Sequence, residues 1–463
     1  ERAGFLKEDI LGLTQLDKFM YMIKDVRDNR DLKLKLNKID LDDKKIFETL
    51  AGGWSEDIFQ FNSGGMKQFL RNMKPDAIDD LIAANAIYRP GPLSSNADKN
   101  YCDLKHKVKI PEYDKGMKSI TKKTHGLMIY QETVMAAMVV AGFSLTEADE
   151  VRTIMKKFKK EEMAKMKDKF VDGYVKNKKV SKEDANRVWA KLVAFSSYGF
   201  NKSHSASYAI MAYWATYFKT YFPEEFYACA LHYAQRGQDS EMEVSSILDE
   251  IESRKLRLRL SPPDANRSTM RFVSDHKLKT VYWSLEGIKG IGPKIVYKIL
   301  EERGNGNFKS MEDFYARMKK LKVGVGKAVV EKLIKAGAFD NLENLKEVSE
   351  RRELMRFLYQ DLDNSYVDFK DRYEDRDFYK NSTWAYIQKG ISGFGKIDYR
   401  NILNKLDKKV ADWYLNATEF LVVEEKWKEA CIAGNIVGIY ERDSKKGKFG
   451  NVIIESNKIH IVF

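Results

Sequence analysis

The chain has 463 residues, long enough for about two to four domains of ordinary size. Its 81 lysine and arginine residues outnumber 68 aspartate and glutamate residues, and the net charge of +13 favours polyanionic partners. Nucleic acid, nucleotides and an acidic membrane surface all fit this charge equally well. No apolar run of about 18 residues and no signal-peptide pattern occurs, so we expect a cytoplasmic protein that neither spans a membrane nor is secreted.

The three cysteines, Cys102, Cys229 and Cys431, are far apart and form no C-x-x-C pattern, so we expect them to be reduced. Residue 1 is a glutamate, and the opening residues read as the middle of a strand, so we expect the chain to be part of a longer protein. In this strand Asp9 lies among apolar residues. A carboxylate in that setting is more often capped or at a sheet edge than a metal ligand, and Glu8 should face the opposite side.

Two features before residue 150 mark where helices break and begin. The cluster Arg89-Pro90-Gly91-Pro92 must interrupt any helix and form a rigid turn. Ser144 and Glu147 have the spacing of a capping box, which starts a helix whose apolar residues from Val151 to Phe158 recur at helical spacing.

Positive charge is concentrated between Val151 and Lys202, a segment with 15 lysine or arginine residues and six acidic residues. Arg152, Lys156, Lys159 and Lys160 share one face of the predicted helix with no acidic residue between them. This crowding is unfavourable unless an anion binds there, and a plain solvated face is the alternative.

The segment Tyr198-Gly199-Phe200-Asn201-Lys202-Ser203-His204-Ser205 is a polar turn that leads into an apolar run from Tyr208 to Phe222, which ends at Pro223 as a buried helix would. We expect Ser203 to be the N-cap, with free backbone N–H groups, Lys202 and His204 directed at one spot that could hold a phosphate. An ordinary cap beside a surface histidine is the alternative.

A glycine-rich turn, Gly287-Ile288-Lys289-Gly290-Ile291-Gly292-Pro293-Lys294, follows the strand-like segment Thr280 to Leu285. Pro293 should be the first residue of the next helix. Such a turn can hold a nucleic-acid phosphate with backbone amides, and a tight connection without a ligand is the alternative. Residues 323–326 with a helix from Lys327 to Ala336 form a weaker second unit.

The C-terminal third has no proline after Pro293 and should be largely helical as far as about residue 409. The best domain boundary is Leu260-Ser261-Pro262-Pro263. Short alternating strands follow Glu429, at 431–440, 450–454 and 458–463, and are typical of the start of a small barrel. H-E-x-x-H, G-x-S-x-G and Walker-type motifs are absent from the sequence.

Together these segments resemble the alpha subunit of bacterial replicative DNA polymerase III, the C-family polymerase. The likeness follows the family's order through residues 5–340, and the motifs that carry it are Lys7-Glu8-Asp9-Ile10-Leu11-Gly12-Leu13, Phe59-Gln60, Tyr88-Arg89-Pro90-Gly91-Pro92-Leu93, Tyr130-Gln131-Glu132, Ala141-Gly142-Phe143-Ser144-Leu145, Tyr198 to Ser205, Pro262-Pro263-Asp264, Ile288-Lys289-Gly290 and Leu333 to Asp340.

The resemblance implies roles for individual residues. Asp9 matches a metal-binding aspartate of the palm, which binds Mg²⁺, and Lys7 is the adjacent lysine that faces the triphosphate. The residues that it places at the incoming nucleotide are Arg89, Arg152, Lys156, Lys157, Lys202, Ser203 and His204. Thr153 stands where the family commonly has a second arginine, with Lys156 or Lys157 as substitutes. The residues that it places on duplex DNA are Lys289, Gly290, Gly292 and Lys294.

The sequence therefore predicts an α+β, predominantly helical, multidomain chain: a palm fragment (1–40), large helical fingers (41–262), a tandem helix-hairpin-helix region (263–345), a helical connector (346–428) and a partial OB-like barrel (429–463). The predicted function is DNA-directed DNA polymerase, with primer-template DNA and deoxynucleoside triphosphate as substrates. The two-metal Mg²⁺ site would be completed by carboxylates of a missing N-terminal half that carries the phosphoesterase-like domain, palm and thumb.

That half would be a separate chain, as in a split polymerase, or the rest of a longer one. A sliding clamp is a further candidate partner, although residues 342–426 contain no convincing clamp-binding peptide. The alternative function is a non-catalytic nucleic-acid-binding subunit with a vestigial nucleotide site, which Gly64 and Thr153 favour because both replace arginines common in the family.

Overall fold

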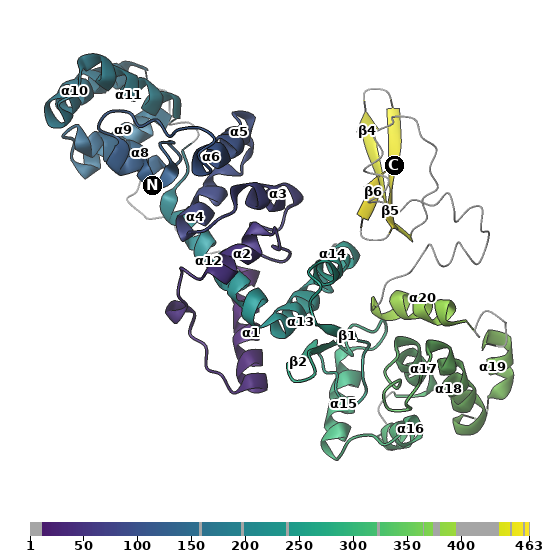
Figure 1. Ribbon diagram of the computed structural model, residues 1–463. Helices are drawn as coiled ribbons and strands as arrows, with labels where there is room; N and C mark the ends of the chain where they lie inside the picture. The colour runs from purple at the N-terminus through teal and green to yellow at the C-terminus, as the bar shows by residue number, and fades with distance from the viewer. Residues whose placement is uncertain are drawn as a thin grey trace, which may run out of the picture. The chain divides into compact units, whose positions relative to one another are not determined.

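The computed structural model describes residues 12–156, 160–195, 199–237, 240–321, 325–363, 365–373, 380–394, 435–444, 447–456 and 459–462. Most of these residues are helical, as predicted, and the described strands form two small sheets (Figure 1). The chain divides into two compact units. The first consists of residues up to Phe19 together with Leu34–Tyr221, and the second of Met20–Lys33 together with the residues from Phe222 onward. Helix α1 (Thr14–Arg30) contributes to both.

The first unit is built around the long helix α12 (Lys202–Tyr221), which packs against α2 (Lys44–Ala51) and α4 (Ile78–Ile87). Small buried residues of α12 at Ala209, Ala212 and Ala215 allow these helices to approach closely. The predicted break at the Arg89-Pro90-Gly91-Pro92 cluster is confirmed, because α4 ends at Ile87. The predicted rigid turn is wrong, because Pro90 is the first residue of a new short helix, a position where proline loses no hydrogen bond. The shorter elements around them are η1 (Leu36–Lys38), α3 (Gly64–Met73), α5 (Pro90–Ser94), α6 (Ala97–Lys105), α7 (Lys118–Thr121) and η2 (Lys122–Thr124).

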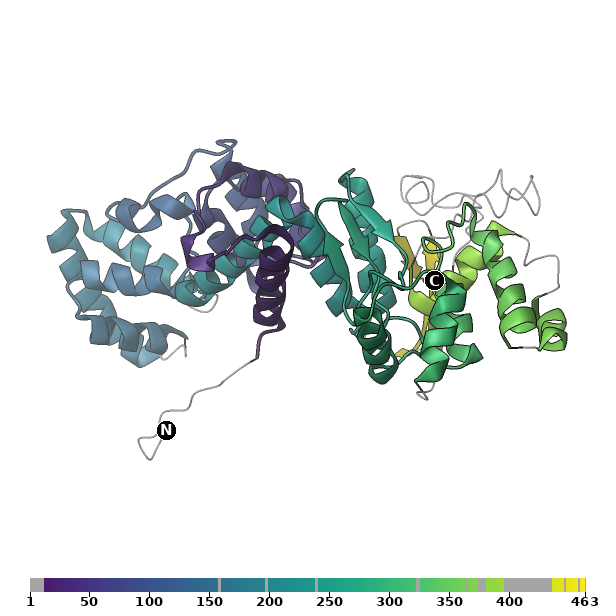
Figure 2. The same ribbon diagram turned by 90° about the horizontal axis from the view of Figure 1, so that it is seen from below.

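Four further helices of the first unit share a core of their own and lie together in both views (Figures 1 and 2): α8 (Gln131–Val140), α9 (Leu145–Lys156), α10 (Lys160–Lys178) and α11 (Lys182–Phe195). The predicted capping box is confirmed: the Ser144 backbone N–H donates to Glu147 Oε2 at 2.8 Å, and the Glu147 N–H donates to Ser144 Oγ at 3.2 Å. The predicted stripe of four basic residues is only partly described, since α9 ends at Lys156 and residues 157–159 lie outside the described ranges.

The second unit begins with α13 (Pro223–Ala234) and α14 (Ser240–Ser253), and α13 packs against a three-stranded sheet. The sheet consists of β1 (Arg259–Ser261), β2 (Val273–Asp275) and β3 (Thr280–Tyr282), in the order β1-β3-β2. β1 pairs parallel with β3, and β2 pairs antiparallel with it. Pro223 starts α13 directly after α12, as the sequence predicted.

Between Pro293 and Ser392 the described residues of the second unit are mainly helical, and they share a core that includes the fully buried Trp384. α15 begins at Pro293 and α17 covers Lys327–Ala336, both as predicted. The elements of this part are α15 (Pro293–Gly304), α16 (Met311–Lys320), α17, η3 (Val348–Glu350), α18 (Arg351–Phe357), the π-helix η4 (Leu358–Leu362), α19 (Tyr366–Tyr373) and α20 (Asn381–Ser392).

Three antiparallel strands follow at the C-terminal end of the chain: β4 (Asn435–Ser444), β5 (Gly447–Ser456) and β6 (Ile459–Val462), in that order. They fall close to the predicted strands. This meander is the portion of the predicted barrel that the structure describes, and its closure into an OB-like barrel stays a prediction. None of the described helices is both long and apolar enough to cross a membrane.

The C-terminal half of α1 is held to the second unit by a network of charges. The Arg30 guanidinium donates to Glu224 Oε2 at 2.7 Å and to both carboxylate oxygens of Glu225, at 2.7 and 2.8 Å. One turn earlier, Asp25 accepts a hydrogen bond from Ser274 Oγ at 2.6 Å. Burial, opposed in part by the Ser274 hydrogen bond and reinforced by the charge of Glu225, raises the pKa of Asp25 to about 6.

Replacing Asp25 by asparagine should stabilise the second unit at neutral pH by about 1–2 kcal/mol, because it removes a half-buried charge that the fold disfavours. The folded protein binds more protons than the unfolded chain between about pH 4 and 6, so the wild-type stability falls as the pH rises through this range. Urea unfolding of Asp25→Asn and wild type at pH 4 and 7.5 measures the difference. The gain should vanish at pH 4, and a gain at pH 7.5 from the exposed Asp28→Asn control would contradict this account.

Candidate functional site

Helices α8 and α12 begin next to each other because the residues before them pair as a short parallel bridge. Tyr130 and Phe200 form this bridge. The Gln131 N–H donates to Phe200 O at 2.9 Å, the Phe200 N–H donates to Ile129 O at 3.2 Å, and the Gln131 side-chain amide donates to Gly199 O at 2.9 Å. Two helix N-termini therefore meet at one place, and each carries the positive end of a helix dipole. Such a place suits an anion.

A carboxylate of the chain already reaches this position. Both oxygens of Glu132 accept from the Lys202 backbone N–H, at 2.9 Å each. Glu132 lies in the first turn of α8, where its negative charge is favourable, and it accepts from Lys202, the first residue of α12. One carboxylate therefore stabilises both helix N-termini. Glu132 belongs to one of the motifs that resemble the family, but its role could not be predicted from the sequence, because the contact joins residues 70 positions apart.

The predicted N-cap at Ser203 is wrong. Asn201 Oδ1 accepts from the His204 backbone N–H at 2.8 Å, so Asn201 is the residue whose side chain caps α12. The Ser203 hydroxyl donates to the same Asn201 oxygen at 2.8 Å. Asn and Ser are equally good caps, and the bridge at Phe200 decides between them because it fixes where the helix can begin. The N–H groups of Lys202 and His204, expected to be free, both have acceptors in the chain.

Arg152 reaches the same place from α9. Its Nη1 donates to Gln131 Oε1 at 3.3 Å, and its Nη2 lies 2.8 Å from Asp149 Oδ1 in an i,i+3 ion pair. The Arg152 side chain is 24% exposed, so it can exchange the Asp149 carboxylate for another anion without unfolding α9. Thr153 follows it, half-buried, with no charge to add.

Two more cations lie on the aromatic rings of the bridge. The Arg89 guanidinium carbon is 4.2 Å from the centroid of the Phe200 ring, and Lys202 Nζ is 5.2 Å from that of Tyr130. Burial lowers the pKa of Arg89, although a guanidinium stays protonated at neutral pH. Burial also raises the pKa of Tyr130, which keeps the phenol neutral. We call Arg89, Gln131, Arg152 and Lys202, with the two helix N-termini, the bridge site.

The other predicted site residues lie at the edge of the described ranges, outside them, or further along α12. Lys7, Asp9 and Lys157 lie outside the described residues, and Lys156 is the last residue of α9. His204 lies in the first turn of α12, against the rings of Phe200 and Tyr208. Within the described ranges no group of three His, Cys, Asp or Glu side chains could hold a metal ion.

The glycine-rich turn has the predicted form. Gly290 has φ of +81°, a left-handed conformation that favours glycine. Gly292 occupies the N-cap position of α15, directly before Pro293. The side chains of Lys289 and Lys294 are exposed on the turn, which leaves a basic, glycine-rich helix start open to a polyanion.

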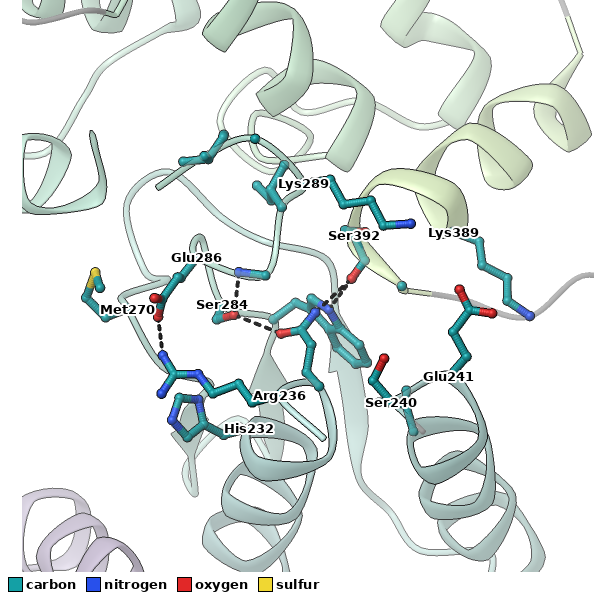
Figure 3. A pocket seen from close by; sticks show the side chains of 18 of the residues that line it. His232, Arg236, Ser240, Glu241, Met270, Ser284, Glu286, Lys289, Lys389 and Ser392 are labelled. Carbon is teal, nitrogen blue, oxygen red and sulfur yellow. Dashed lines mark hydrogen bonds and ion pairs between the residues drawn. The ribbon is translucent and has the colours of Figure 1, made fainter. Parts of the chain in front are cut away.

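A pocket of about 470 Å³ lies beside this turn (Figure 3). Its walls come from the end of α13, the start of α14, the residues 283–292 and the end of α20. Arg236 and Glu286 form an ion pair at its rim. Burial, with the positive charges of Arg236 and Arg271, lowers the pKa of His232 in the wall to about 4, so this imidazole is neutral at neutral pH.

Hydrogen bonds to the end of α20 fix the position of the glycine-rich turn. Ser392 O accepts from Trp283 Nε1 at 2.7 Å and from Gln235 Nε2 at 3.1 Å. Ile391 O accepts from the Lys289 backbone N–H at 2.8 Å. The turn is therefore anchored from outside its own hairpin. These contacts could not be predicted from the sequence, because they join segments about 100 or more residues apart.

Comparison with known proteins matches both parts of the chain. A family described as the bacterial DNA polymerase III alpha subunit finger domain matches residues 12–178, and a helix-hairpin-helix motif matches residues 257–352. DNA polymerase III subunit alpha of Campylobacter jejuni is 35% identical over 372 residues, which cover 77% of this chain and 30% of that protein. The chain belongs to the family of bacterial DNA polymerase III alpha subunits.

Other alpha subunits agree with this assignment. That of Aquifex aeolicus is 36% identical over 73% of this chain and 29% of its own length, and that of Vibrio cholerae is 38% identical over 74% of this chain and 30% of its own length. The chain thus spans about 30% of the curated alpha subunits that it matches. The finger match includes Arg89, Gln131 and Arg152 of the bridge site, and the helix-hairpin-helix match includes the glycine-rich turn and α17.

Proposed function

We propose that this chain supplies the fingers and duplex-binding elements of a DNA polymerase, which transfers a nucleotide from a deoxynucleoside triphosphate to a primer 3′ end. The observation that carries the proposal is the bridge site, where Arg89, Arg152 and Lys202 converge with two helix N-termini in a finger domain. A triphosphate carries several negative charges, and these positive groups match it chemically.

The bridge site would act by holding and orienting the triphosphate. The leaving pyrophosphate gains negative charge as the bond to the α-phosphate breaks, so cations already in place stabilise the transition state more than the ground state. Arg152 would exchange its Asp149 partner for a phosphate oxygen, and Lys202 extends from the start of α12 beside it. Ser203 and His204 are proposed to contact the nucleotide from the same helix turn.

Metal chemistry would come from Mg²⁺ bound in part by Asp9, next to Lys7, as the family resemblance implies. Bound Mg²⁺ neutralises the triphosphate and stabilises both oxygens of the in-line displacement. The remaining carboxylates would be supplied by a palm outside this chain, in a partner polypeptide or in the rest of a longer one.

DNA would be held by the glycine-rich turn through Lys289, Gly290, Gly292 and Lys294, with α17 as the second unit of the tandem motif. The exposed lysines and the helix start at Pro293 support contact with phosphates rather than base edges. The meander β4-β5-β6 is proposed to belong to an OB-like barrel, and a sliding clamp is proposed as a further partner.

A non-catalytic nucleic-acid-binding subunit is the competing proposal. Two carboxylates that already contact the bridge site favour it: Glu132 at the Lys202 N–H and Asp149 at Arg152. A site that no longer binds a nucleotide would have its positive groups satisfied by such internal carboxylates. The two proposals differ in what the cations do during turnover.

Arg152→Ala should lower kcat/KM for the nucleotide by about 100-fold in primer extension by the complete polymerase, because it removes a cation that acts on developing charge. The matched control is Arg187→Ala, which removes an arginine of the same unit from an i,i+3 ion pair with Asp184. Steady-state primer extension at varied nucleotide concentration measures both variants. An unchanged rate at limiting nucleotide in Arg152→Ala would favour the non-catalytic proposal.

A further inference from the structure

A strip of four aromatic rings extends from the bridge site along the outside of α12. The ring centroids of Phe200 and His204 are 5.4 Å apart, and those of His204 and Tyr208 are 4.4 Å apart. Phe59, from the segment between α2 and α3, adds the fourth ring at 5.5 Å from Tyr208. We call these four residues the aromatic strip. Its first ring is the one on which the Arg89 guanidinium lies.

Phe59 is held outward by a rigid turn. Its side chain is 36% exposed, whereas Ile58 and Phe61 on either side are fully buried. Asp57 and Gln60 have φ of +56° and +67°, a left-handed conformation that is unfavourable for residues other than glycine. The unfavourable backbone conformation of these two residues is therefore what holds the Phe59 ring at the surface.

The turn is also fastened to the helix that carries the other three rings. Lys219 of α12 is fully buried, and its Nζ donates to Trp54 O at 3.3 Å and to Glu56 O at 2.5 Å. The buried Ser55 hydroxyl donates to Phe61 O, which closes the turn from within. A buried ammonium is expensive unless it is well satisfied, so this lysine ties the turn and α12 into one rigid piece.

We propose that the aromatic strip is a stacking platform for the unpaired bases of a nucleic-acid strand. Aromatic side chains beside a cationic groove are how proteins hold single strands without reading sequence, because every base has a π-face. The strip provides rings in a fixed row, and its Phe200 end lies at the bridge site, whose cations are proposed to hold the incoming nucleotide. This inference rests on the proposed function, since it places the template strand ahead of the primer on the same face of the fingers.

Binding of a fluorescein-labelled single-stranded oligothymidylate by the full chain, followed by fluorescence anisotropy, tests the platform. The variant is Phe59→Leu with Tyr208→Leu, which keeps apolar side chains and removes the rings. Affinity should fall by about 5- to 100-fold, with the salt dependence unchanged because no phosphate contact is lost. Tyr113→Leu is the matched control: its half-buried ring in the same unit has Lys118 Nζ 5.5 Å from its centroid but is outside the strip.

Photocrosslinking locates the bound strand directly, even if other parts of the chain also bind DNA and mask the loss of affinity. An oligonucleotide that carries 5-iodouracil should crosslink to Phe59, His204 or Tyr208, as mapped by mass spectrometry. Three outcomes would overturn the proposal: crosslinks confined to residues beyond 222, an equal loss of affinity in Tyr113→Leu, or no binding by the wild type. Retained affinity in the double variant together with absent crosslinks at the strip would indicate a protein-docking surface instead. Neither assay needs turnover, so failure of the Arg152→Ala test would leave this result standing, and the reverse also holds.

Discussion

Arg351→Ala should lower the free energy of unfolding of the second unit by about 2–4 kcal/mol, because it removes a fully buried guanidinium and leaves the half-buried Asp340 carboxylate without its partner. The Arg351 side chain is 1% exposed. Its Nε donates to Asp340 Oδ1 at 2.9 Å, its Nη2 pairs with Asp340 Oδ2, and its Nη1 donates to Lys335 O at 3.2 Å. This guanidinium therefore joins the start of α18 to the end of α17.

Gly337, with φ of +88°, ends α17 close to the Arg351 guanidinium, where a β-carbon would lie 2.3 Å from Arg351 Nη2. Arg356→Ala is the matched control, since Arg356 lies in the same helix, is 52% exposed and pairs with Glu353 at 3.0 Å. Urea unfolding should show a change of less than about 1 kcal/mol for Arg356→Ala. A similarly small change for Arg351→Ala would mean that the buried pair is not a stabilising element.

Asp9→Ala should lower primer extension by the complete polymerase by at least about 1000-fold and leave DNA affinity nearly intact. Asp9 would help to hold a Mg²⁺ ion, which would contribute several kcal/mol of charge stabilisation in the transition state. DNA binding is proposed to depend on the glycine-rich turn and the aromatic strip, neither of which contains Asp9.

Glu8→Ala is the control for this change, because adjacent residues of a strand face opposite sides. Primer extension and duplex binding would be measured on the same preparations of both variants. The assignment of Asp9 fails if DNA binding is lost while turnover per bound complex is unchanged, or if Glu8→Ala reduces extension as much as Asp9→Ala.

Local signals in the sequence were sufficient where a few neighbouring residues decide the structure. The capping box at Ser144 and Glu147, the helix start at Pro293 and the whole of α17 are as predicted, since caps, proline and glycine act within one helical turn. The bridge-site cations Arg89, Arg152 and Lys202 are brought to one place, which the sequence alone could indicate only through the family resemblance.

Contacts between distant residues could not be predicted in the same way. Glu132 at the Lys202 N–H, Lys219 beneath the Phe59 turn and Ser392 beside Trp283 each depend on the packing of separate elements, and side-chain chemistry alone does not reveal which elements meet. The N-cap at Ser203 was predicted wrongly for the same reason, because the bridge between Tyr130 and Phe200 decides where α12 begins. The predicted boundary at residues 260–263 stays a prediction; the compact units meet along the chain at Tyr221 and Phe222.

The second unit is discontinuous in sequence, and this limits how the gene can be divided for expression. Met20–Lys33 belongs to that unit although more than 180 residues separate it from Phe222. A fragment that starts at Phe222 would retain Glu224 and the fully buried Glu225 but lose the Arg30 guanidinium that contacts both carboxylates. An independently folding version would therefore need residues 20–33 restored, by a linker or as a separate peptide added in trans.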